Sequence, residues 1–355
     1  MFGYEITFLQ VFATAFGIGL LVFIHELGHF ILAKKFKLKV EQFSFGFGPE
    51  IIGFTRAETR YSICAIPLGG MVKMPGEDVE SATGSPDEFL SQPWYVRLLI
   101  ALFGPLMNYL LAVIIFASVI FFWGLSKPST EAIIGDLVPK YPAYEAGLKA
   151  GDKIVKINQT DVKDWEEMSG FVHKHPDEVL EFSVLRNDKD ILEFKIKTVR
   201  DPAYKIGLIG VAPKILAEKV GILQSMNFGV KMVVKQSWFT LKYLGEKIVK
   251  WEKPELSGPI GVVQILAKAA KAGIENLLYL LAVISTALGL FNLLPIPMLD
   301  GGHIFIALIE GLVRKPLGKK AIYAANSVGF VIIISIFLFA TYNDLLRIGL
   351  FKGKI

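Results

Sequence analysis

The chain has 355 residues, of which 53% are hydrophobic and only 20% are charged, and its mean hydropathy is +0.49. Because soluble domains carry more charge and less apolar surface, this composition argues against an ordinary soluble protein and directs attention to membrane spans. The net charge is +5, but no basic stripe with interleaved aromatic residues appears, so we expect lipid contact and no nucleic-acid partner. The single cysteine, Cys64, excludes an intrachain disulfide and a cysteine-rich zinc site.

Four segments are long and apolar enough to cross a bilayer as helices, which takes roughly 20 residues. They lie near residues 6–33, 98–123, 277–294 and 321–340. We do not expect the first to be a cleaved signal peptide, because its apolar run is too long, no Lys or Arg precedes it, and no small-residue cleavage site follows it.

The basic residues beside these segments predict how the chain crosses the membrane. They form three clusters, one after the first span, one before the second and one before the fourth: Lys34, Lys35, Lys37 and Lys39; Arg97; Arg314, Lys315, Lys319 and Lys320. The three clusters share the cytosolic side only if the chain begins outside and crosses four times. Residues 124–276 and both termini are then expected on the extracytoplasmic side.

The first loop, residues 42–74, is rich in Phe, Ile, Tyr and Gly and alternates as strands do. It predicts either a small cytosolic sheet or a hairpin that dips toward the membrane, since both faces are unusually apolar for a loop.

The large loop after the second span contains a segment of ordinary soluble composition, about residues 130–200. Its pattern predicts an α/β module with strands near 131–138, 154–157, 179–185 and 191–197, and a helix over 164–173 that Asp164 can cap. Apolar residues at helical spacing in 217–251 are interrupted by lysines, each costing roughly 3 kcal/mol at mid-membrane. We therefore expect an amphipathic helix on the outer surface there, not a fifth span.

The motif with the clearest chemistry is His25-Glu26-Leu27-Gly28-His29 in the first span. Two histidines four residues apart lie on one face of a helix, about 6 Å apart, which suits a single tetrahedral zinc ion. The glutamate between them can take a proton from water at the metal. The motif follows an uninterrupted apolar run, so it lies inside a membrane helix, where ionisable groups are costly and indicate a function.

A catalytic zinc site needs a third protein ligand, and the candidates lie in residues 292–303, where the third span closes. Pro295 and Pro297 must break the helix, and the Gly-Gly pair that follows Asp300 permits a sharp turn. Irregular backbone at membrane depth lines a cavity or is buried in protein. We expect Asp300 to be the third ligand, because such a turn fixes a carboxylate. His303 is the competing ligand, or else a structural histidine at the start of the next helix.

The predicted topology brings both halves of this site to one depth. The first and third spans run parallel, so His29 and Asp300 both come at the lysine-rich end. His29 precedes Lys34 by five residues, about 7–8 Å of helix. We therefore expect the metal just below the cytosolic surface.

Together these motifs resemble the site-2 protease family of intramembrane zinc metalloproteases, in its RseP-like branch. The matching residues are His25-Glu26-x-x-His29, Asn292-x-x-Pro295-x-Pro297-x-Leu299-Asp300-Gly301, and Gly104-Pro105-x-x-Asn108 in the second span. The segment Tyr144–Asp152 also resembles the start of a bacterial PDZ domain, which that branch carries between its second and third spans. The resemblance covers nearly the whole chain, although the best-known enterobacterial members have two such domains in tandem.

The resemblance implies roles for particular residues. His25, His29 and Asp300 would bind Zn²⁺, and Glu26 would be the general base and then the proton donor to the leaving amine. Asn292 would hydrogen-bond the unwound substrate backbone, unless it only satisfies helix ends freed by the prolines. The first-loop hairpin would pair with substrate as a strand, through Tyr61, Ile63, Ala65, Gly69 and Gly70.

For the PDZ-like module, the resemblance implies that the Gly147-Leu148 turn presents backbone amides to a peptide carboxylate, while the alternative is a rigid spacer or filter that binds no peptide. His173 and His175 in this module are expected to be surface residues.

The predicted fold is a membrane α-helical protein with four transmembrane helices, a cytosolic-side β-hairpin region and one extracytoplasmic PDZ-like α/β domain. Its parts are a first membrane half (1–123), the PDZ-like domain (124–213), an amphipathic connector (214–276) and a second membrane half (277–355). The resemblance implies a bacterial inner-membrane endopeptidase that cuts transmembrane segments of single-span proteins in regulated intramembrane proteolysis. Its substrates would be anti-sigma-factor-like regulators or remnant signal peptides, with an upstream site-1 protease acting on the same substrate.

Two other functions use the same residues. A membrane metal transporter would need ionisable groups at several depths along a path, whereas the acids and histidines of these spans gather near one end. A non-catalytic PDZ scaffold would have no use for a buried base at Glu26.

Overall fold

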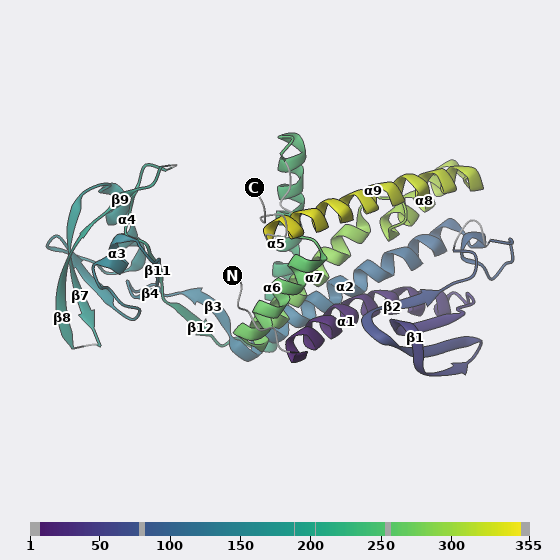
Figure 1. The fold of residues 1–355 in the computed structure, drawn as a ribbon, viewed down its shortest axis with the longest axis horizontal. Helices are drawn as coiled ribbons and strands as arrows, with labels where there is room; N and C mark the ends of the chain where they lie inside the picture. The colour runs from purple at the N-terminus through teal and green to yellow at the C-terminus, as the bar shows by residue number, and fades with distance from the viewer. Residues whose placement is uncertain (1–7, 78–81, 188, 203, 253–256, 349–355) are drawn as a thin grey trace, which may run out of the picture. The chain divides into compact units, whose positions relative to one another are not determined.

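The computed structural model describes residues 8–77, 82–187, 189–202, 204–252 and 257–348 (Figure 1). The chain divides into two compact units. The first combines residues 1–119 with 221–355, and the second is formed by residues 120–220.

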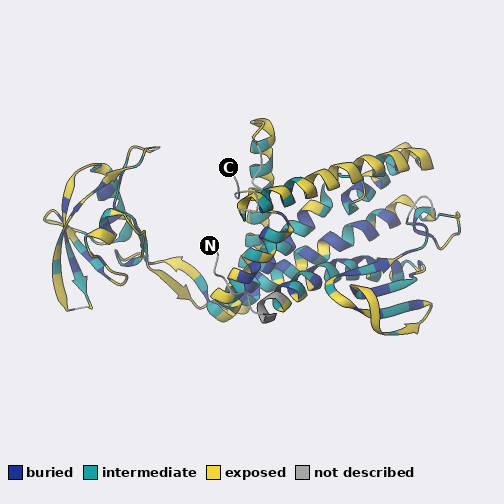
Figure 2. Cartoon of the chain, viewed as in Figure 1, coloured by how far each residue is buried: buried dark blue, intermediate teal, exposed yellow. Residues whose placement is uncertain are grey.

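Four helices in the described residues are long and apolar enough to cross a membrane, which confirms the predicted spans. They are α1 (Phe8–Lys35), α2 (Trp94–Trp123), α7 (Ile274–Leu293) and α9 (Lys319–Arg347). Only 11% of the most apolar window of α9 is buried, and Figure 2 shows this helix as mostly exposed. An apolar helix with so little protein cover is suited to a lipid surrounding.

Two contacts attach α9 to other parts of its unit. A Cβ atom added at Gly329 would collide with the carbonyl oxygen of Pro297, which belongs to the segment between α7 and the next helix. A glycine is therefore required for this approach. Nearer the end of α9, the buried carboxylate of Asp344 accepts hydrogen bonds from the N–H groups of Gly258 (3.1 Å) and Gly261 (2.8 Å).

Gly258 precedes α6 (Pro259–Ala272) and Gly261 lies in its first turn. This helix falls within the helical connector expected over 214–276, although no separate helix was predicted there. Its Leu266 is fully buried, in a cluster with Leu21 of α1 and Leu281 of α7. The helix predicted over 217–251 is confirmed as α5 (Ile222–Val249). Its small residue Gly229 lies against the backbone of α2, where a Cβ would come within 2.7 Å of the Val113 carbonyl oxygen.

The loop between α1 and α2 forms a curved sheet from β1 (Gln42–Arg56) and β2 (Thr59–Lys73), followed by a short 3-10 helix, Phe89–Ser91. Both strands bend back, so that Phe43 pairs with Tyr61 on one side and with Val72 on the other. The first half of β1 is therefore an inner strand, and the last residues of β2, from Gly70 to Lys73, form an edge. This edge runs along α1, because Gly70 lies against Phe23.

The second unit is an α/β module whose core is a cluster of buried apolar side chains that includes Phe182, Ile154 and Leu180. Its main sheet has the order β6-β5-β7-β8, and a helix, α4 (Trp165–Lys174), is capped by Asp164 as predicted. The strands of this sheet are β5 (Lys153–Ile157), β6 (Thr160–Asp161), β7 (Val179–Arg186) and β8 (Asp190–Lys197).

Three pairs of short strands and a one-turn helix complete the unit. They are β3 (Leu125–Pro128) with β12 (Ile215–Glu218), β4 (Ile134–Leu137) with β11 (Val211–Pro213), β9 (Val199–Arg200) with β10 (Gly207–Leu208), and the one-turn helix α3 (Pro142–Glu145).

The helix that begins at Asp300 differs from the prediction. We expected a sharp turn at Asp300 and its two glycines, but Asp300 is the first residue of α8 (Asp300–Val313) and the glycines lie within its first turn. The left-handed residue is Met298, with a φ of 73°. The glycines serve close packing instead, since a Cβ at Gly301 would collide with the Leu294 carbonyl oxygen.

Near its C-terminal end, α8 is fixed to α2 by a buried ion pair. The Arg97 guanidinium donates to the Glu310 carboxylate, whose other oxygen accepts from the Leu317 N–H at 2.7 Å. Both charged side chains are almost completely buried. Removing either partner would leave an unpaired charge inside the protein. This ion pair therefore holds the two helices together strongly.

We predict that the α/β module loses stability in acid through Asp152. Burial disfavours the Asp152 carboxylate, but hydrogen bonds from Arg186 (2.7 Å) and from the Lys149 N–H (2.8 Å) outweigh it and hold the pKa of Asp152 below its usual value. Its contribution is therefore complete at neutral pH and is lost as the pH falls below about 4. Asp152→Asn should cost about 2 kcal/mol at pH 7, measured by hydrogen exchange of β5 and β7 in the full chain. Equal protection of the variant and the native module at pH 7 would contradict this role.

Candidate active site and metal centre

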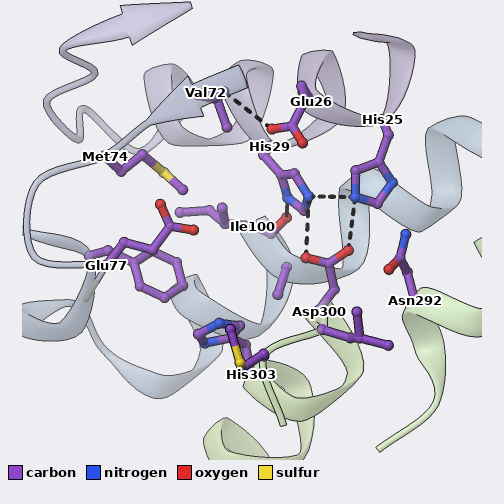
Figure 3. A pocket seen from close by; sticks show the side chains of 14 residues that line it. His25, Glu26, His29, Val72, Met74, Glu77, Ile100, Asn292, Asp300 and His303 are labelled. Atoms are coloured by element: carbon purple, nitrogen blue, oxygen red, sulfur yellow. Dashed lines mark hydrogen bonds and ion pairs between the residues drawn. The ribbon is translucent and has the colours of Figure 1, made fainter. Parts of the chain in front are cut away.

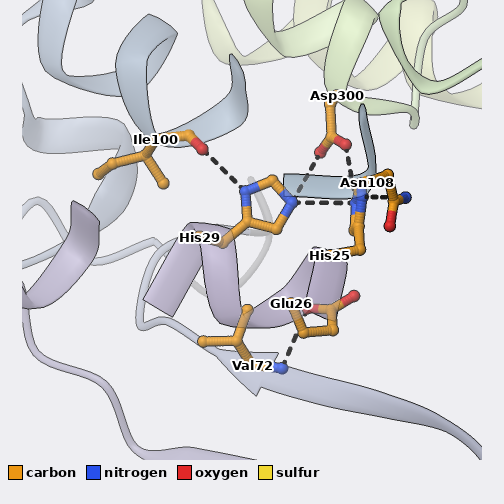
Figure 4. Close-up of polar contacts among 7 residues, drawn as sticks. All are labelled: His25, Glu26, His29, Val72, Ile100, Asn108 and Asp300. Carbon is orange, nitrogen blue, oxygen red and sulfur yellow. Dashed lines mark hydrogen bonds and ion pairs between the residues drawn. The ribbon is translucent and has the colours of Figure 1, made fainter. Parts of the chain in front are cut away.

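Three side chains from two helices converge inside the first unit (Figures 3 and 4). The Nε2 atoms of His25 and His29 in α1 lie 3.1 Å apart. The carboxylate of Asp300, at the start of α8, lies 3.0 Å from His25 Nε2 and 3.3 Å from His29 Nε2. Among the residues that the structure describes, this is the one group of three or more His, Cys, Asp or Glu side chains that could hold a metal ion.

The geometry of this group fits zinc. Ligand atoms 2.0–2.1 Å from a tetrahedral zinc ion are separated from one another by roughly 3.3 Å, close to the three distances between these atoms. The Oδ2 atom of Asp300 is buried, 3.0 Å from His25 Nε2. If that nitrogen carries no proton, the buried carboxylate needs a cation to compensate its charge. The donor set is thus two imidazoles and one carboxylate, a combination found at catalytic zinc sites that keep one position open.

The second span, α2, packs against α1 at this site and fixes the two histidine rings. The Nδ1 atom of His29 donates to the carbonyl oxygen of Ile100 (2.8 Å), so Nδ1 carries the proton and Nε2 is left free to bind a metal. A Cβ atom at Gly104 would collide with His29 Nε2 and would lie 3.0 Å from His25 Cε1. A Cβ at Gly28 would collide with the carbonyl oxygen of Phe103. The two helices can meet at this depth only because both positions are glycine.

The same part of α2 also contacts His25 and the helix α7, which leads to Asp300. Asn108 is fully buried, and its side-chain amide lies 3.2 Å from His25 Nδ1. Its backbone carbonyl oxygen accepts a hydrogen bond from the Ser285 hydroxyl of α7 at 2.8 Å. The segment Gly104-Pro105-x-x-Asn108 therefore touches both histidines and the helix that leads to Asp300. The family resemblance included this segment but implied no role for it, because the sequence does not show which helix faces it.

Glu26 lines the same cavity as the ligand group and lies between the histidine pair and the sheet (Figure 4). Its Oε2 atom accepts a hydrogen bond of 3.2 Å from the backbone N–H of Val72, in the edge of β2. The predicted general base is therefore held by one of the two edges of this sheet, the edge that borders α1.

A cavity of about 200 Å³ opens beside these residues, room for several water molecules at roughly 30 Å³ each. Figure 3 shows the ligand group at one end and His303 at the other. Asn292 lines the cavity next to Asp300, as expected for a substrate-binding residue. His303, the competing third ligand, lines the cavity but is not part of the convergent group, and its ring packs against Phe89 at 5.8 Å.

The structure separates the hairpin residues that were expected to pair with substrate. Tyr61 pairs with Phe43 and with Phe54, and Ile63 pairs with Phe45 and with Ile52, so their strand already has partners on both sides. An added strand could not use β2 at these two positions. Ala65 is exposed and lies beyond the residues that pair on both sides. Gly69 and Gly70, by contrast, lie buried at the edge that borders α1.

The turn of the α/β module has its amides already paired. The Gly147 N–H donates to the Tyr144 carbonyl oxygen (3.2 Å), and the Leu148 N–H donates to that of Ala143 (3.1 Å). This turn therefore offers no free N–H at these two positions. His173 and His175 are half-buried near the end of α4, and the Nδ1 atom of His175 donates to the Phe171 carbonyl oxygen.

Comparison with known proteins decides the family. The model of peptidase family M50 matches residues 13–336 of this chain. The chain belongs to peptidase family M50, the site-2 protease family.

Relatives of similar length agree with this assignment. A Rickettsia conorii protein that is named a zinc metalloprotease is 36% identical over 95% of this chain and 98% of its own length. A Clostridium acetobutylicum protein with the same type of name is 34% identical, again over 95% and 98%. The zinc metalloprotease RasP of Geobacillus kaustophilus is 30% identical over 96% of this chain and 97% of its own. Among solved structures, a PDZ domain from Listeria monocytogenes aligns with 24% of this chain and 90% of its own, at 17% identity and a TM-score of 0.22.

This protein is therefore a zinc metalloprotease of the site-2 type. The family assignment favours a protease over a metal transporter or a non-catalytic scaffold. The residues of the convergent group are of the types that such an enzyme needs for its zinc ion.

We predict that Gly104→Ala strongly weakens zinc binding. The new methyl group would occupy the space of the His29 imidazole, whose position is fixed by Ile100. Zinc content after purification measures the effect, and at least a tenfold loss is expected. Gly245→Ala in α5 is the matched control, because nothing lies within 4 Å of a Cβ there and the helix should gain about 1 kcal/mol. Full zinc occupancy in Gly104→Ala would show that α2 does not constrain the ligands.

Proposed function

We propose that this protein is an intramembrane endopeptidase that cuts the transmembrane segments of single-span membrane proteins. The observation that carries the proposal is the convergence of His25, His29 and Asp300 between apolar helices that are long enough to span a bilayer. A protease whose ligand group lies within such helices acts on peptide bonds that enter the same helical layer.

In the proposed mechanism, His25, His29 and Asp300 hold the ion, with Nε2 as the donor atom of each imidazole. When bound, zinc supplies a Lewis acid that polarises the scissile carbonyl group and lowers the pKa of water. Glu26 takes the proton of the attacking water and passes it to the amine that leaves. The Val72 N–H, which donates to Glu26, holds the carboxylate in place for both transfers.

A helical substrate must unwind before it can be cut, because its carbonyl groups are hydrogen-bonded within the helix and need replacement partners in the membrane. We propose that the edge of β2 from Gly69 to Lys73 provides them by adding the unwound substrate as a strand. Asn292, on the opposite wall of the cavity, supplies a further hydrogen bond to the substrate backbone.

We propose the topology that the basic clusters predict, with the metal site near the cytosolic face and the α/β module outside. The module is proposed to be PDZ-like. Because the amides of its Gly147-Leu148 turn are paired internally, the geometry supports a spacer or size filter more than a carboxylate-binding site at that turn. The proposed setting is a bacterial inner membrane, where anti-sigma-factor-like regulators already trimmed by a site-1 protease, or remnant signal peptides, are substrates.

We predict that Glu26→Gln keeps zinc but loses cleavage. The amide has nearly the shape of the carboxylate but cannot accept the proton, so cleavage of a single-span substrate should fall by about 10²–10⁴-fold. Asp300→Ala should instead lose the zinc itself, because it removes one of three ligands. Zinc content and substrate cleavage, measured on the same purified samples, separate the two effects. Wild-type cleavage by Glu26→Gln would refute the mechanism, and full zinc occupancy in Asp300→Ala would refute the ligand assignment.

We predict opposite labelling for cysteines placed on the two proposed sides. In a Cys64→Ser background the chain has no other thiol, so Lys163→Cys in the α/β module and Lys315→Cys after α8 each give one exposed site. A membrane-impermeant maleimide added to spheroplasts should label Lys163→Cys only, and both after lysis. Labelling of Lys315→Cys in intact spheroplasts would overturn the topology.

A further inference from the structure

The two histidines of the ligand group differ in how their second nitrogen is satisfied. His29 Nδ1 faces the Ile100 carbonyl oxygen, which can only accept, so the proton must be on Nδ1. His25 Nδ1 faces Asn108 at 3.2 Å, and the Asn108 atom placed there is the amide nitrogen Nδ2. An amide nitrogen can only donate, which would require the proton of His25 to be on Nε2.

That arrangement conflicts with the position of His25 Nε2. This atom lies 3.1 Å from His29 Nε2 and 3.0 Å from Asp300 Oδ2, at the centre of the ligand group. An imidazole nitrogen that carries a proton has no lone pair to give to a metal ion. A neutral His25 can bind zinc through Nε2 only if its proton is on Nδ1, and a buried Nδ1–H needs an acceptor.

The acceptor is present on the same side chain. The Oδ1 atom of Asn108 is buried without a hydrogen-bond partner. The oxygen and nitrogen of an amide have almost the same shape, so which one occupies which place must be decided from the hydrogen bonds that each makes. A half-turn of the Asn108 amide places Oδ1 opposite His25 Nδ1 and leaves the rest of the side chain where it is.

We propose that Asn108 is a positioning residue for the zinc ligand His25, which accepts the His25 Nδ1–H through its Oδ1 atom and so holds the imidazole in its metal-binding tautomer. The proposal rests on the ligand assignment of the proposed function. Partners of this kind fix the orientation of a ligating imidazole and strengthen it as a donor.

The surroundings hold Asn108 in the place that this role requires. The residue is completely buried in α2, and its backbone carbonyl oxygen is tied to the Ser285 hydroxyl of α7. Its backbone is thus attached to a second helix beside its own. A side chain held in this way can orient the ring of a neighbouring helix.

The test compares two substitutions of Asn108 that differ only in whether an acceptor remains. Asn108→Asp keeps an oxygen opposite His25 Nδ1 but has no N–H to donate, whereas Asn108→Leu has neither and is of similar size. We expect Asn108→Leu to weaken zinc binding about 10–100-fold and Asn108→Asp to stay within a few-fold of the native protein. Zinc affinity is measured by competition with a chelator on the full-length protein in detergent. The visible spectrum of the Co²⁺-loaded protein reports the ligand geometry in each case.

The outcomes separate this proposal from the proposed function. If the amide donates to His25 as placed, Asn108→Asp must lose as much affinity as Asn108→Leu, and that result overturns the proposal. So does a native affinity and Co²⁺ spectrum in Asn108→Leu. If His25→Ala still binds zinc as tightly as the native protein, the ligand assignment itself is wrong, whatever Asn108 does. Asn276→Leu, at an exposed position on α7, is the matched control and should leave the affinity unchanged.

Discussion

The close approach of α2 to α1 is the constraint on which the metal centre depends. Gly104 allows the imidazole of His29 to lie directly against the α2 backbone, and Gly28 allows the Phe103 carbonyl oxygen to approach α1. Once the backbones are this close, Ile100 and Asn108 come within hydrogen-bonding distance of the two rings. In a membrane, where apolar contact alone does not draw helices together, small residues that permit close packing have a large part in deciding which helices meet.

A second constraint acts on the third ligand. The segment between α7 and α8 passes through the helical layer without regular structure, and it remains there because its carbonyl groups are packed against glycines of neighbouring turns. The Arg97–Glu310 ion pair then fixes the far end of α8 to α2. Asp300 is thus held between two attachments to the rest of the unit, which limits how far its carboxylate can move from the histidines.

Much of this arrangement was predictable from the sequence, and the reasons for the failures are physical. The four spans follow from apolar length alone, and His25, His29 and Asp300 follow from residue type, spacing and the parallel direction of two spans. The turn expected at Asp300 was wrong, because glycines serve close packing as often as they serve turns. The inner and edge positions of β2 could not be assigned, since strand pairing within a bent hairpin depends on contacts distant in sequence. The role proposed for Asn108 could not be predicted, because it depends on which residue of α1 faces this position of α2.

The contact between Gly329 and Pro297 gives the fourth span an influence that its exposed surface does not suggest. This glycine lies in a helix that is otherwise mostly open to its surroundings, yet it touches the segment that ends at Asp300. A helix in a bilayer adjusts its tilt to the thickness of the hydrocarbon layer. Any change in the tilt of α9 would therefore act on the backbone at Pro297, three residues before Asp300.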